Sequence, residues 1–236
     1  MLETLNALVV TYWPQLLLIA AVSYLIGSVN FAILVTRAFS HKDIRDVGSG
    51  NAGMTNVLRS QGKLPALFTT FGDLGKSIVS VLLAVWIIRF AKTDSVIAAE
   101  QAEASVRYLA GLCCVLGHMF PVYFGFRGGK GVLAAFGMLL MVDWKVALIV
   151  IGIFIVVLLC SHMVSLSSLT GSASAVLLTW VFDRFIYQWD SATVLFCTLS
   201  TAIIVSLLFI MHRSNIGRII KGTEHKFAFG KKKKGE

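Results

Sequence analysis

The sequence predicts an all-α integral membrane protein with about seven transmembrane helices, of which one or two are short or interrupted. Of its 236 residues, 57% are hydrophobic and only 14% are charged, and the mean hydropathy is +0.81. The apolar residues form nearly continuous runs, whereas a helix of a soluble domain carries them on one stripe. Most charged residues lie in the segments between these runs.

Seven apolar runs are candidate spans, at about 14–36, 64–90, 107–124, 131–142, 145–162, 166–187 and 193–211. Because a helix needs ~20 residues to cross the hydrocarbon core, the fourth run is predicted to be a half-span or a tilted piece. The second run is predicted to be interrupted by the charges of Gly72–Lys76. The chain starts without a basic segment, so no signal peptide is expected. We expect one transmembrane domain over 1–236, ending in a basic tail over 227–236.

Lysine and arginine are concentrated in three segments: after the first run, around residues 127–130, and in the C-terminal tail. With seven spans, all three fall on one side of the membrane, and the other side holds mainly Asp and Glu. The positive-inside rule therefore places these segments and the C-terminus in the cytoplasm and the N-terminus outside. The net charge of +9 suits anionic lipid headgroups, and no nucleic-acid partner is expected.

Residues 125–132, GFRGGKGV, form a glycine-rich basic loop between two apolar runs. Its glycines allow positive φ angles and a close approach of the backbone to a ligand. Successive N–H groups in such a turn can hold an anion, and Arg127 and Lys130 add charge. The loop is therefore predicted to cradle a phosphate. Gly131 stands where a nucleotide-binding loop has Ser or Thr, which argues against a nucleotide hydrolase.

A second polar stretch, residues 44–59, is dense in small and amide residues, namely Gly48, Ser49, Gly50, Asn51, Gly53, Thr55 and Asn56. These are also the ordinary residues of turns, so a turn-rich loop is the simpler explanation. A binding role is favoured by the density of hydrogen-bonding groups and by Arg59 at the end of the stretch, whose planar guanidinium suits phosphate.

Asp73 and Lys76 are three residues apart and share a face if the second run is one helix. Charges within a span are costly and usually functional, which makes Lys76 a candidate phosphate ligand. An ion pair that merely locks two helices explains both residues equally well. His118, just before the glycine-rich loop, has the simpler interpretation of a hydrogen-bonded structural histidine.

The later part of the chain contributes further polar residues. Ser165 lies between the fifth and sixth runs, where helix capping explains its neighbouring serines as well. His212 and Asn215 are three apart and can share one helix face, and Glu224 follows them. Lipid binding explains the four lysines at 231–234. The four cysteines lie in apolar runs without metal-ligand spacing, so no metal site or cofactor is expected.

Taken together, these segments resemble the bacterial acyl-phosphate:glycerol-3-phosphate acyltransferase family over nearly the whole chain. The residues that carry the resemblance are Gly48–Asn56 with Arg59, Gly117–Pro121 with Phe126–Gly131, and His212–Asn215 with Gly222–Glu224. Their order and spacing make the match specific. The chain departs from the family where Asn30 replaces a proline that is often expected after Gly27 and Ser28, a change expected to relax a kink in the first span.

The resemblance implies an enzyme of the bacterial cell membrane with its active site facing the cytoplasm. It would transfer a fatty acyl group from acyl phosphate to the 1-hydroxyl group of glycerol 3-phosphate, giving lysophosphatidic acid and inorganic phosphate, in the first acylation of phospholipid synthesis. The alternative is a membrane transporter for a phosphorylated or other anionic solute, since interrupted, charged helices also form transport sites. The sequence leaves open the acyl-chain preference, the oligomeric state and whether the chain binds the soluble acyl-phosphate synthase.

Residue roles follow from this resemblance and from the side-chain chemistry. The candidate catalytic residues are Ser49, Asn51, His212 and Asn215. Either His212 or the phosphate of the donor would be the general base. A serine acyl-enzyme ranks lower, because no histidine–carboxylate pair is evident beside Ser49. The candidate substrate- and phosphate-binding residues are Gly50, Thr55, Asn56, Arg59, Lys76, His118, Gly128, Gly129, Lys130, Gly131, Ser165 and Glu224.

Overall fold

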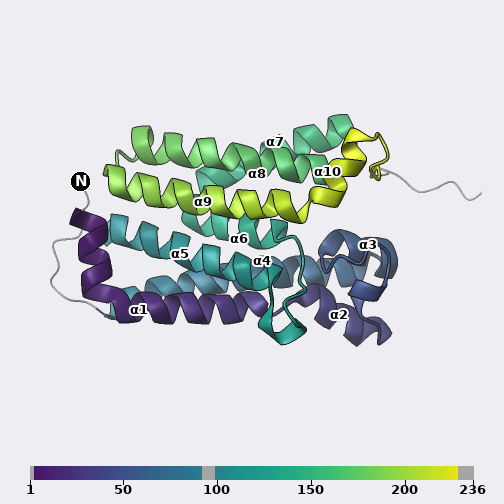
Figure 1. The fold of residues 1–236 in the computed structure, drawn as a ribbon, viewed down its shortest axis with the longest axis horizontal. Helices are drawn as coiled ribbons and strands as arrows, with labels where there is room; N and C mark the ends of the chain where they lie inside the picture. The colour runs from purple at the N-terminus through teal and green to yellow at the C-terminus, as the bar shows by residue number, and fades with distance from the viewer. Residues whose placement is uncertain (1–2, 92–98, 228–236) are drawn as a thin grey trace, which may run out of the picture.

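The computed structural model describes residues 3–91 and 99–227, and every regular element within these ranges is helical (Figure 1). The α-helices are α1 (Glu3–Ser28), α2 (Phe31–Ser40), α3 (Met54–Gln61), α4 (Lys63–Phe90), α5 (Ala99–Met119), α6 (Val132–Val142), α7 (Trp144–Ser161), α8 (Val164–Val181), α9 (Ser191–Met211) and α10 (Arg213–Ile220). Short helical turns cover Ile44–Asp46, Val122–Phe124 and Phe182–Ile186. Apart from Phe227, the predicted basic tail lies outside the described residues.

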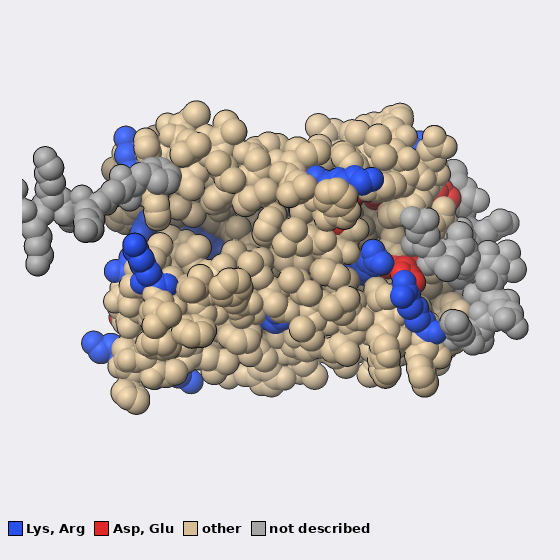
Figure 2. All heavy atoms as spheres, turned by 180° about the vertical axis from the view of Figure 1, so that it is seen from behind, with Lys and Arg blue, Asp and Glu red and all other residues tan. Residues whose placement is uncertain are grey.

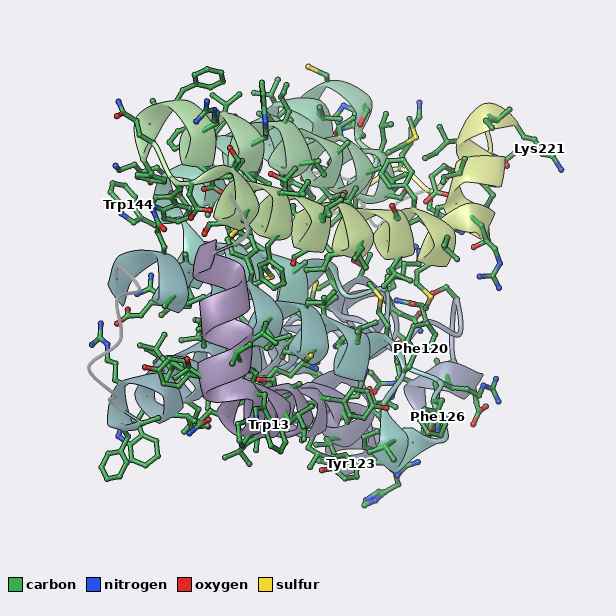
Figure 3. The ribbon with its side chains drawn as sticks, turned by 60° about the vertical axis from the view of Figure 1, so that its left-hand side comes forward. Trp13, Phe120, Tyr123, Phe126, Trp144 and Lys221 are labelled. Carbon is green, nitrogen blue, oxygen red and sulfur yellow. The ribbon has the colours of Figure 1, made fainter. Side chains whose placement is uncertain are left out.

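Six segments within the described ranges are long and apolar enough to span a membrane, and α6, with 11 residues, is shorter. They match the seven predicted runs in order, with α1 and α2 together forming the first. The α6–α7 turn lies at the same end of the bundle as the end of α8, because the Tyr187 hydroxyl donates to Asp143 Oδ2 at 2.8 Å. Figure 3 shows Trp144, which follows this turn, at the opposite end from Lys221. The short α6 therefore connects the two ends of the bundle.

The first span is broken between α1 and α2. The Asn30 side chain caps α2 by accepting a hydrogen bond from the Ile33 N–H group, and the two helices are separated by Val29 and Asn30. The expectation that Asn30 relaxes the kink is wrong, because an asparagine cap ends one helix and begins the next without proline. Asn30 Nδ2 also donates to the Ala52 carbonyl group at 3.4 Å, which ties the break to the 44–56 loop.

The expected interruption of the second run is also wrong, because α4 is a single helix of 28 residues. Asp73 and Lys76 lie within it and are buried, with 1% and 5% of their surfaces exposed. They form an ion pair of 2.9 Å, so the charges are satisfied without breaking the helix. A polar pair that is neutralised locally does not need the backbone to unwind.

The helices form two neighbouring layers that are joined at the centre. In Figure 1, α7, α8 and α9 lie on one side, α1, α4 and α5 lie on the other, and α6 lies between them. Glycines allow close packing: a methyl group on Gly27 would lie 2.0 Å from the Cys114 carbonyl oxygen, and one on Gly117 would lie 2.2 Å from that of Tyr24. Both contacts join α1 to α5, which fixes the start of the glycine-rich loop.

Charged side chains are sparse over the broad middle of the surface. Figure 2 shows Lys and Arg at both ends of the molecule, whereas the Asp and Glu visible in this view lie mainly at the end opposite to α10. The end that holds α10 is the more purely cationic of the two in this view. The elements α2, α3 and α10 lie together at this end in Figure 1, and we call it the site end. An apolar waist between charged ends is the surface expected of a protein whose helices cross a membrane.

Candidate active site

One cavity of about 700 Å³ opens among the polar segments at the site end. The predicted residues that line it are Ser49, Gly50, Asn51, Thr55, Asn56, Arg59, His118, Lys130, Gly131, Ser165, His212, Asn215 and Glu224. Lys76, Gly128 and Gly129 are outside its lining. Three motifs that are far apart in the sequence therefore share a single space.

Asn56 organises the 44–56 loop on one side of the cavity. Its side chain is 3% exposed, accepts a hydrogen bond from the Ser49 N–H group, and donates to the Val47 carbonyl group at 2.8 Å. It donates to the carbonyl groups of Ile44 and Asn51 as well. Because the amide is already used by the backbone, Asn56 shapes the loop that presents Ser49 and Asn51.

The glycine-rich loop is folded differently from the predicted anion cradle. The Gly128 and Gly129 N–H groups donate to the Met119 and His118 carbonyl groups at 3.1 and 3.2 Å, so they are not free for phosphate. Of the four glycines in the loop, Gly125 and Gly131 have positive φ angles, of 65° and 83°, and Gly128 and Gly129 do not. Gly128 and Gly129 are instead required by close packing, since a methyl group on Gly129 would lie 2.3 Å from the Ala52 carbonyl oxygen. The prediction that Gly128 and Gly129 bind phosphate is therefore corrected: both glycines are needed for close packing.

Arg45 joins the loop to the glycine-rich segment. Its Nη1 atom donates to the Phe124 carbonyl group at 2.8 Å, and its Nη2 atom pairs with Asp43 Oδ2 at 2.8 Å. The hydrogen bond from Arg45 holds the pKa of Asp43 well below its usual range, and the same bond raises the pKa of Arg45. Arg127, whose charge was expected in the cradle, is exposed and outside the cavity lining.

Lys76 lies behind the cavity wall. Its ammonium group is 2.8 Å from the Val29 carbonyl oxygen, 2.8 Å from His118 Nδ1 and 2.9 Å from Asp73 Oδ1. An ammonium group has three N–H bonds, and three acceptors surround this one. The prediction that Lys76 contacts phosphate is therefore corrected, and the interpretation as an ion pair that links helices fits its contacts.

A chain of hydrogen bonds crosses the other side of the cavity. Lys130 Nζ donates to Asn215 Oδ1, and Asn215 Nδ2 donates to Glu224 Oε1 at 2.7 Å. The Ser165 hydroxyl donates to the same carboxylate oxygen at 2.5 Å, and Arg218 Nε donates to Glu224 Oε2 at 2.7 Å. The segment after α10 is thereby held against the starts of α6 and α8.

The environment shifts the pKa values of Lys130 and Glu224 in this chain of hydrogen bonds. Burial lowers the pKa of Lys130 to about 8, although the nearby Glu224 carboxylate opposes the shift. Burial raises the pKa of Glu224, but the hydrogen bonds from Ser165, Asn215 and Arg218 outweigh it and leave a lowered value. At neutral pH the cavity therefore holds a protonated lysine and an ionised glutamate.

His212 lies where α9 meets α10 and is 3% exposed. Burial, followed by the charge of Lys130, lowers its pKa to about 4, so the imidazole is neutral at pH 7. Its Nδ1 atom is 2.8 Å from the Leu208 carbonyl oxygen, which can only accept. The proton therefore lies on Nδ1, and Nε2 keeps the lone pair that a base requires.

Four helices begin at the cavity wall. Its lining includes the first residues of α3 (Met54 and Thr55), α6 (Val132 and Leu133), α8 (Val164 and Ser165) and α10 (Arg213 and Ser214). Helix N-termini carry free N–H groups and partial positive charge, which together favour bound anions. Arg59, Lys130 and Arg218 add full charges on the same wall. This end of the cavity is suited to phosphate groups.

The remainder of the cavity is apolar and runs between α6, α7, α8 and α9. Its lining there includes Phe136 and Leu139, Val150 and Phe154, Ala175, and Ile204 and Leu208. Val150 lies 11 residues before the end of α7, so this part extends on the order of 16 Å along the helix at 1.5 Å per residue. The cavity can hold an alkyl chain attached to a polar head.

Sequence reasoning missed several cavity residues. Arg213, Ser214 and Arg218 lie within or between the two parts of the third motif but were not named as candidate site residues, and Asp73 was considered only as a partner of Lys76. The helical spacing of Ser214 and Arg218 was the available signal, because residues four apart share a face. Within the described ranges, no group of three or more His, Cys, Asp and Glu residues is arranged to hold a metal ion.

Comparison with known proteins gives a consistent result. The profile of a family described as glycerol-3-phosphate acyltransferase matches residues 17–222. A glycerol-3-phosphate acyltransferase of Prochlorococcus marinus (strain MIT 9215) is 39% identical over 211 residues, which are 89% of this chain and 96% of that protein. The enzyme of Neisseria meningitidis serogroup A (strain DSM 15465 / Z2491) is 42% identical over 207 residues, covering 87% of this chain and 94% of its own.

Solved structures show the same fold. The glycerol 3-phosphate form of PlsY (YgiH), an integral membrane glycerol 3-phosphate acyltransferase, aligns with a TM-score of 0.75 and 33% identity over 90% of this chain and 96% of its own. Its lysophosphatidic acid form aligns with a TM-score of 0.73 and 32% identity over 90% and 95% of the two chains. On the match over 17–222 and the identity to these relatives, the chain belongs to the glycerol-3-phosphate acyltransferase family of integral membrane proteins.

Proposed function

We propose that the protein transfers a fatty acyl group from acyl phosphate to the 1-hydroxyl group of glycerol 3-phosphate, giving lysophosphatidic acid and inorganic phosphate. One observation carries this proposal: a single cavity joins a cationic wall of helix N-termini to an apolar space between four helices. A phosphorylated head and an alkyl chain are the two parts of the product. The related structures named for glycerol 3-phosphate and lysophosphatidic acid support both halves.

The phosphate groups of both substrates would bind at the cationic wall. Lys130 and Arg59 supply charge from two different motifs, and both line the same cavity. N–H groups at the starts of α3, α6 and α10 would complete the two sites. Gly50 and Thr55 line the same wall beside them.

Because acyl phosphate has a good leaving group, the main task of the protein would be to orient the two substrates. Ser49 and Asn51 are held by the loop that Asn56 organises, and they would donate hydrogen bonds to the oxyanion that forms at the acyl carbon. Such a donor is typically worth ~10²–10³ in rate. The phosphate leaves with the electrons of the broken carbon–oxygen bond.

The attacking hydroxyl group must lose a proton. His212 Nε2 has the free lone pair for this step, and Asn215 is on the same helix face one turn along. The departing phosphate is the alternative acceptor, since it is bound beside the hydroxyl group. His212→Ala separates the two, because the acidic limb of the pH–rate profile disappears only if His212 is the base.

We further propose that the site end faces the cytoplasm of a bacterial cell, where glycerol 3-phosphate is supplied. The segments at this end, between α2 and the start of α4, around Lys130 and after α9, carry most of the Lys and Arg, which supports this orientation through the positive-inside rule. We also propose that residues 1–236 form a single domain that crosses the membrane seven times, with the short α6 as one of the crossings. Labelling of single cysteines placed at Lys42 and at Lys145 in sealed cells, with an impermeant reagent, tests the orientation.

The primary test is phosphate release by purified protein given palmitoyl phosphate, with and without glycerol 3-phosphate. Acceptor-dependent release that falls at least ~10²-fold in Lys130→Ala supports the transferase and the role of Lys130. Lys63→Ala is the matched control, because Lys63 is exposed and outside the cavity lining. Release without acceptor would indicate an acyl phosphatase. Solute flux into proteoliposomes without any product would instead support the transporter.

A further inference from the structure

The buried charges of α4 converge on His118. Asp73, Lys76 and His118 are 1%, 5% and 3% exposed and come from α4 and the end of α5. Lys76 Nζ lies 2.8 Å from His118 Nδ1, and Asp73 Oδ1 lies 3.4 Å from the same nitrogen. An Asp73–Lys76 ion pair that only held helices together would not require a histidine nitrogen beside both charges. The contacts of His118 therefore indicate a further role.

The break in the first span supplies the third ligand of Lys76. In an unbroken helix the Val29 carbonyl group would accept from the Ile33 N–H group, but Asn30 Oδ1 takes that donor. The freed Val29 carbonyl oxygen lies 2.8 Å from Lys76 Nζ. The ammonium group is therefore held from three directions, by a carbonyl group, a carboxylate and an imidazole.

This arrangement fixes the tautomer of His118. An ammonium group can only donate, so the Nδ1 atom that faces it must accept. A neutral imidazole has one proton, which is then on Nε2. Within the described residues, the ring interacts with other side chains only through Nδ1. The ring lines the cavity and Lys76 does not, so Nε2, the nitrogen that Lys76 leaves unoccupied, is the one available to a ligand in the cavity.

We propose that Lys76, held by Asp73 and the Val29 carbonyl group, is a positioning residue. It fixes His118 in the tautomer with the proton on Nε2, and this N–H group donates a hydrogen bond to a phosphoryl oxygen of the bound acyl phosphate. The proposal rests on the proposed function for the identity of the ligand. The opposite tautomers of the two cavity histidines then have opposite tasks: His118 donates through Nε2, and His212 accepts through Nε2.

The position of Nε2 agrees with such a contact. A methyl group on Gly129 would lie 2.4 Å from His118 Nε2 and 2.3 Å from the Ala52 carbonyl oxygen. The nitrogen is therefore at the meeting point of the glycine-rich loop and the 44–56 loop. Lys130 and Asn51, the neighbours of Gly129 and Ala52, both line the cavity. The Nε2–H group of a neutral His118 would add a hydrogen-bond donor to the cationic wall without adding a charge.

The experiment is a double-mutant cycle on the purified, full-length protein. Removal of one partner leaves a buried charge uncompensated, so the pair is replaced together by Asp73→Asn and Lys76→Met, which keeps the volumes and removes both charges. We expect kcat/KM for palmitoyl phosphate to fall about 10²-fold in the wild-type background. In the His118→Ala background, the same double substitution should lower kcat/KM less than about twofold, because it acts through the imidazole ring that this background lacks.

A second readout measures the tautomer directly. Nitrogen-15 spectra of histidine-labelled protein, with the His118 signal assigned by its loss in His118→Gln, should show a proton on Nε2 in the wild type. In the Asp73→Asn, Lys76→Met variant they should show a mixture. This measurement does not depend on acyl transfer, so it remains decisive for the tautomer if the proposed function fails.

His118→Gln is also a rescue test, since the glutamine amide nitrogen can take the place of Nε2 as a donor. We expect it to keep more activity than His118→Ala and to be insensitive to loss of the charged pair. The matched control is Arg89→Gln with Glu103→Gln, an ion pair outside the cavity lining, which should leave kcat/KM unchanged. Equal losses in both histidine backgrounds, or an unaltered tautomer in the pair variant, would overturn the proposal.

Discussion

Lys130 and Asn215 are joined by a direct hydrogen bond from the lysine ammonium group to the side-chain carbonyl oxygen of the asparagine. The two residues belong to the second and third motifs and are 85 positions apart in the chain. The asparagine donates in turn to Glu224, so one amide separates a cation from a carboxylate. This spacing prevents direct pairing of the lysine with Glu224, as the proposed binding of a substrate phosphate by Lys130 requires.

Asn215→Asp should therefore weaken glycerol 3-phosphate binding. The new carboxylate pairs with Lys130 and faces Glu224, which repels it, so substrate phosphate must displace an ion pair. We expect the KM for glycerol 3-phosphate to rise about tenfold, which corresponds to ~1.4 kcal/mol. Steady-state kinetics at fixed palmitoyl phosphate measures the change. An unchanged KM would show that the Lys130–Asn215 contact is not part of the acceptor site.

The pH dependence of kcat/KM should follow two groups of the free enzyme. His212 must be neutral to accept a proton, so activity falls as pH decreases through its pKa of about 4. Lys130 must be charged to bind phosphate, so activity falls as pH increases through its pKa of about 8. Lys130→Arg should move only the basic limb, to higher pH, because guanidinium stays charged. A basic limb that stays near pH 8 in this variant would assign it to another group.

Asn56→Ala should disorder the loop that presents Ser49. The substitution leaves three backbone carbonyl groups and one N–H group without their side-chain partner. Each unsatisfied group that stays buried costs ~1–3 kcal/mol. We expect faster hydrogen exchange over residues 44–51 and a loss of activity, while the exchange of α7 and α8 stays the same. Loss of activity with unchanged exchange over 44–51 would mean that Asn56 contacts substrate directly.

Gly129→Ala tests the packing role of the glycine-rich loop. The added methyl group would lie 2.3 Å from the Ala52 carbonyl oxygen, so the two loops must separate, at a cost of ~1–3 kcal/mol. We expect a lower melting temperature and reduced kcat. Gly152→Ala on α7 is the matched control, because a methyl group there meets no atom within 4 Å. A Gly129→Ala protein as stable and active as this control would restore the phosphate-cradle interpretation.

Local composition was sufficient to predict the helical membrane class and most of the cavity. The continuous apolar runs reappear as α1, α2 and α4 to α9, since a chain in lipid must satisfy its backbone within each segment. The dense polar motifs around Ser49, Lys130 and His212 all reach one cavity, because polar groups that are concentrated between spans gather at the same end of the bundle. The tertiary structure places these three motifs around the same space.

Other roles depended on contacts between distant segments. Lys76 and Lys130 are both lysines beside apolar runs, yet Lys76 is held by the Val29 carbonyl group and His118, 47 and 42 residues away. Gly128 and Gly129 have the sequence of an anion loop, but their N–H groups are taken by carbonyl groups of α5. Whether a donor is free for a ligand depends on which acceptors the fold places beside it. The sequence by itself determined which polar groups lie between the apolar runs of this protein. Only the tertiary structure decided which of these groups are used in internal hydrogen bonds and which are available to a ligand.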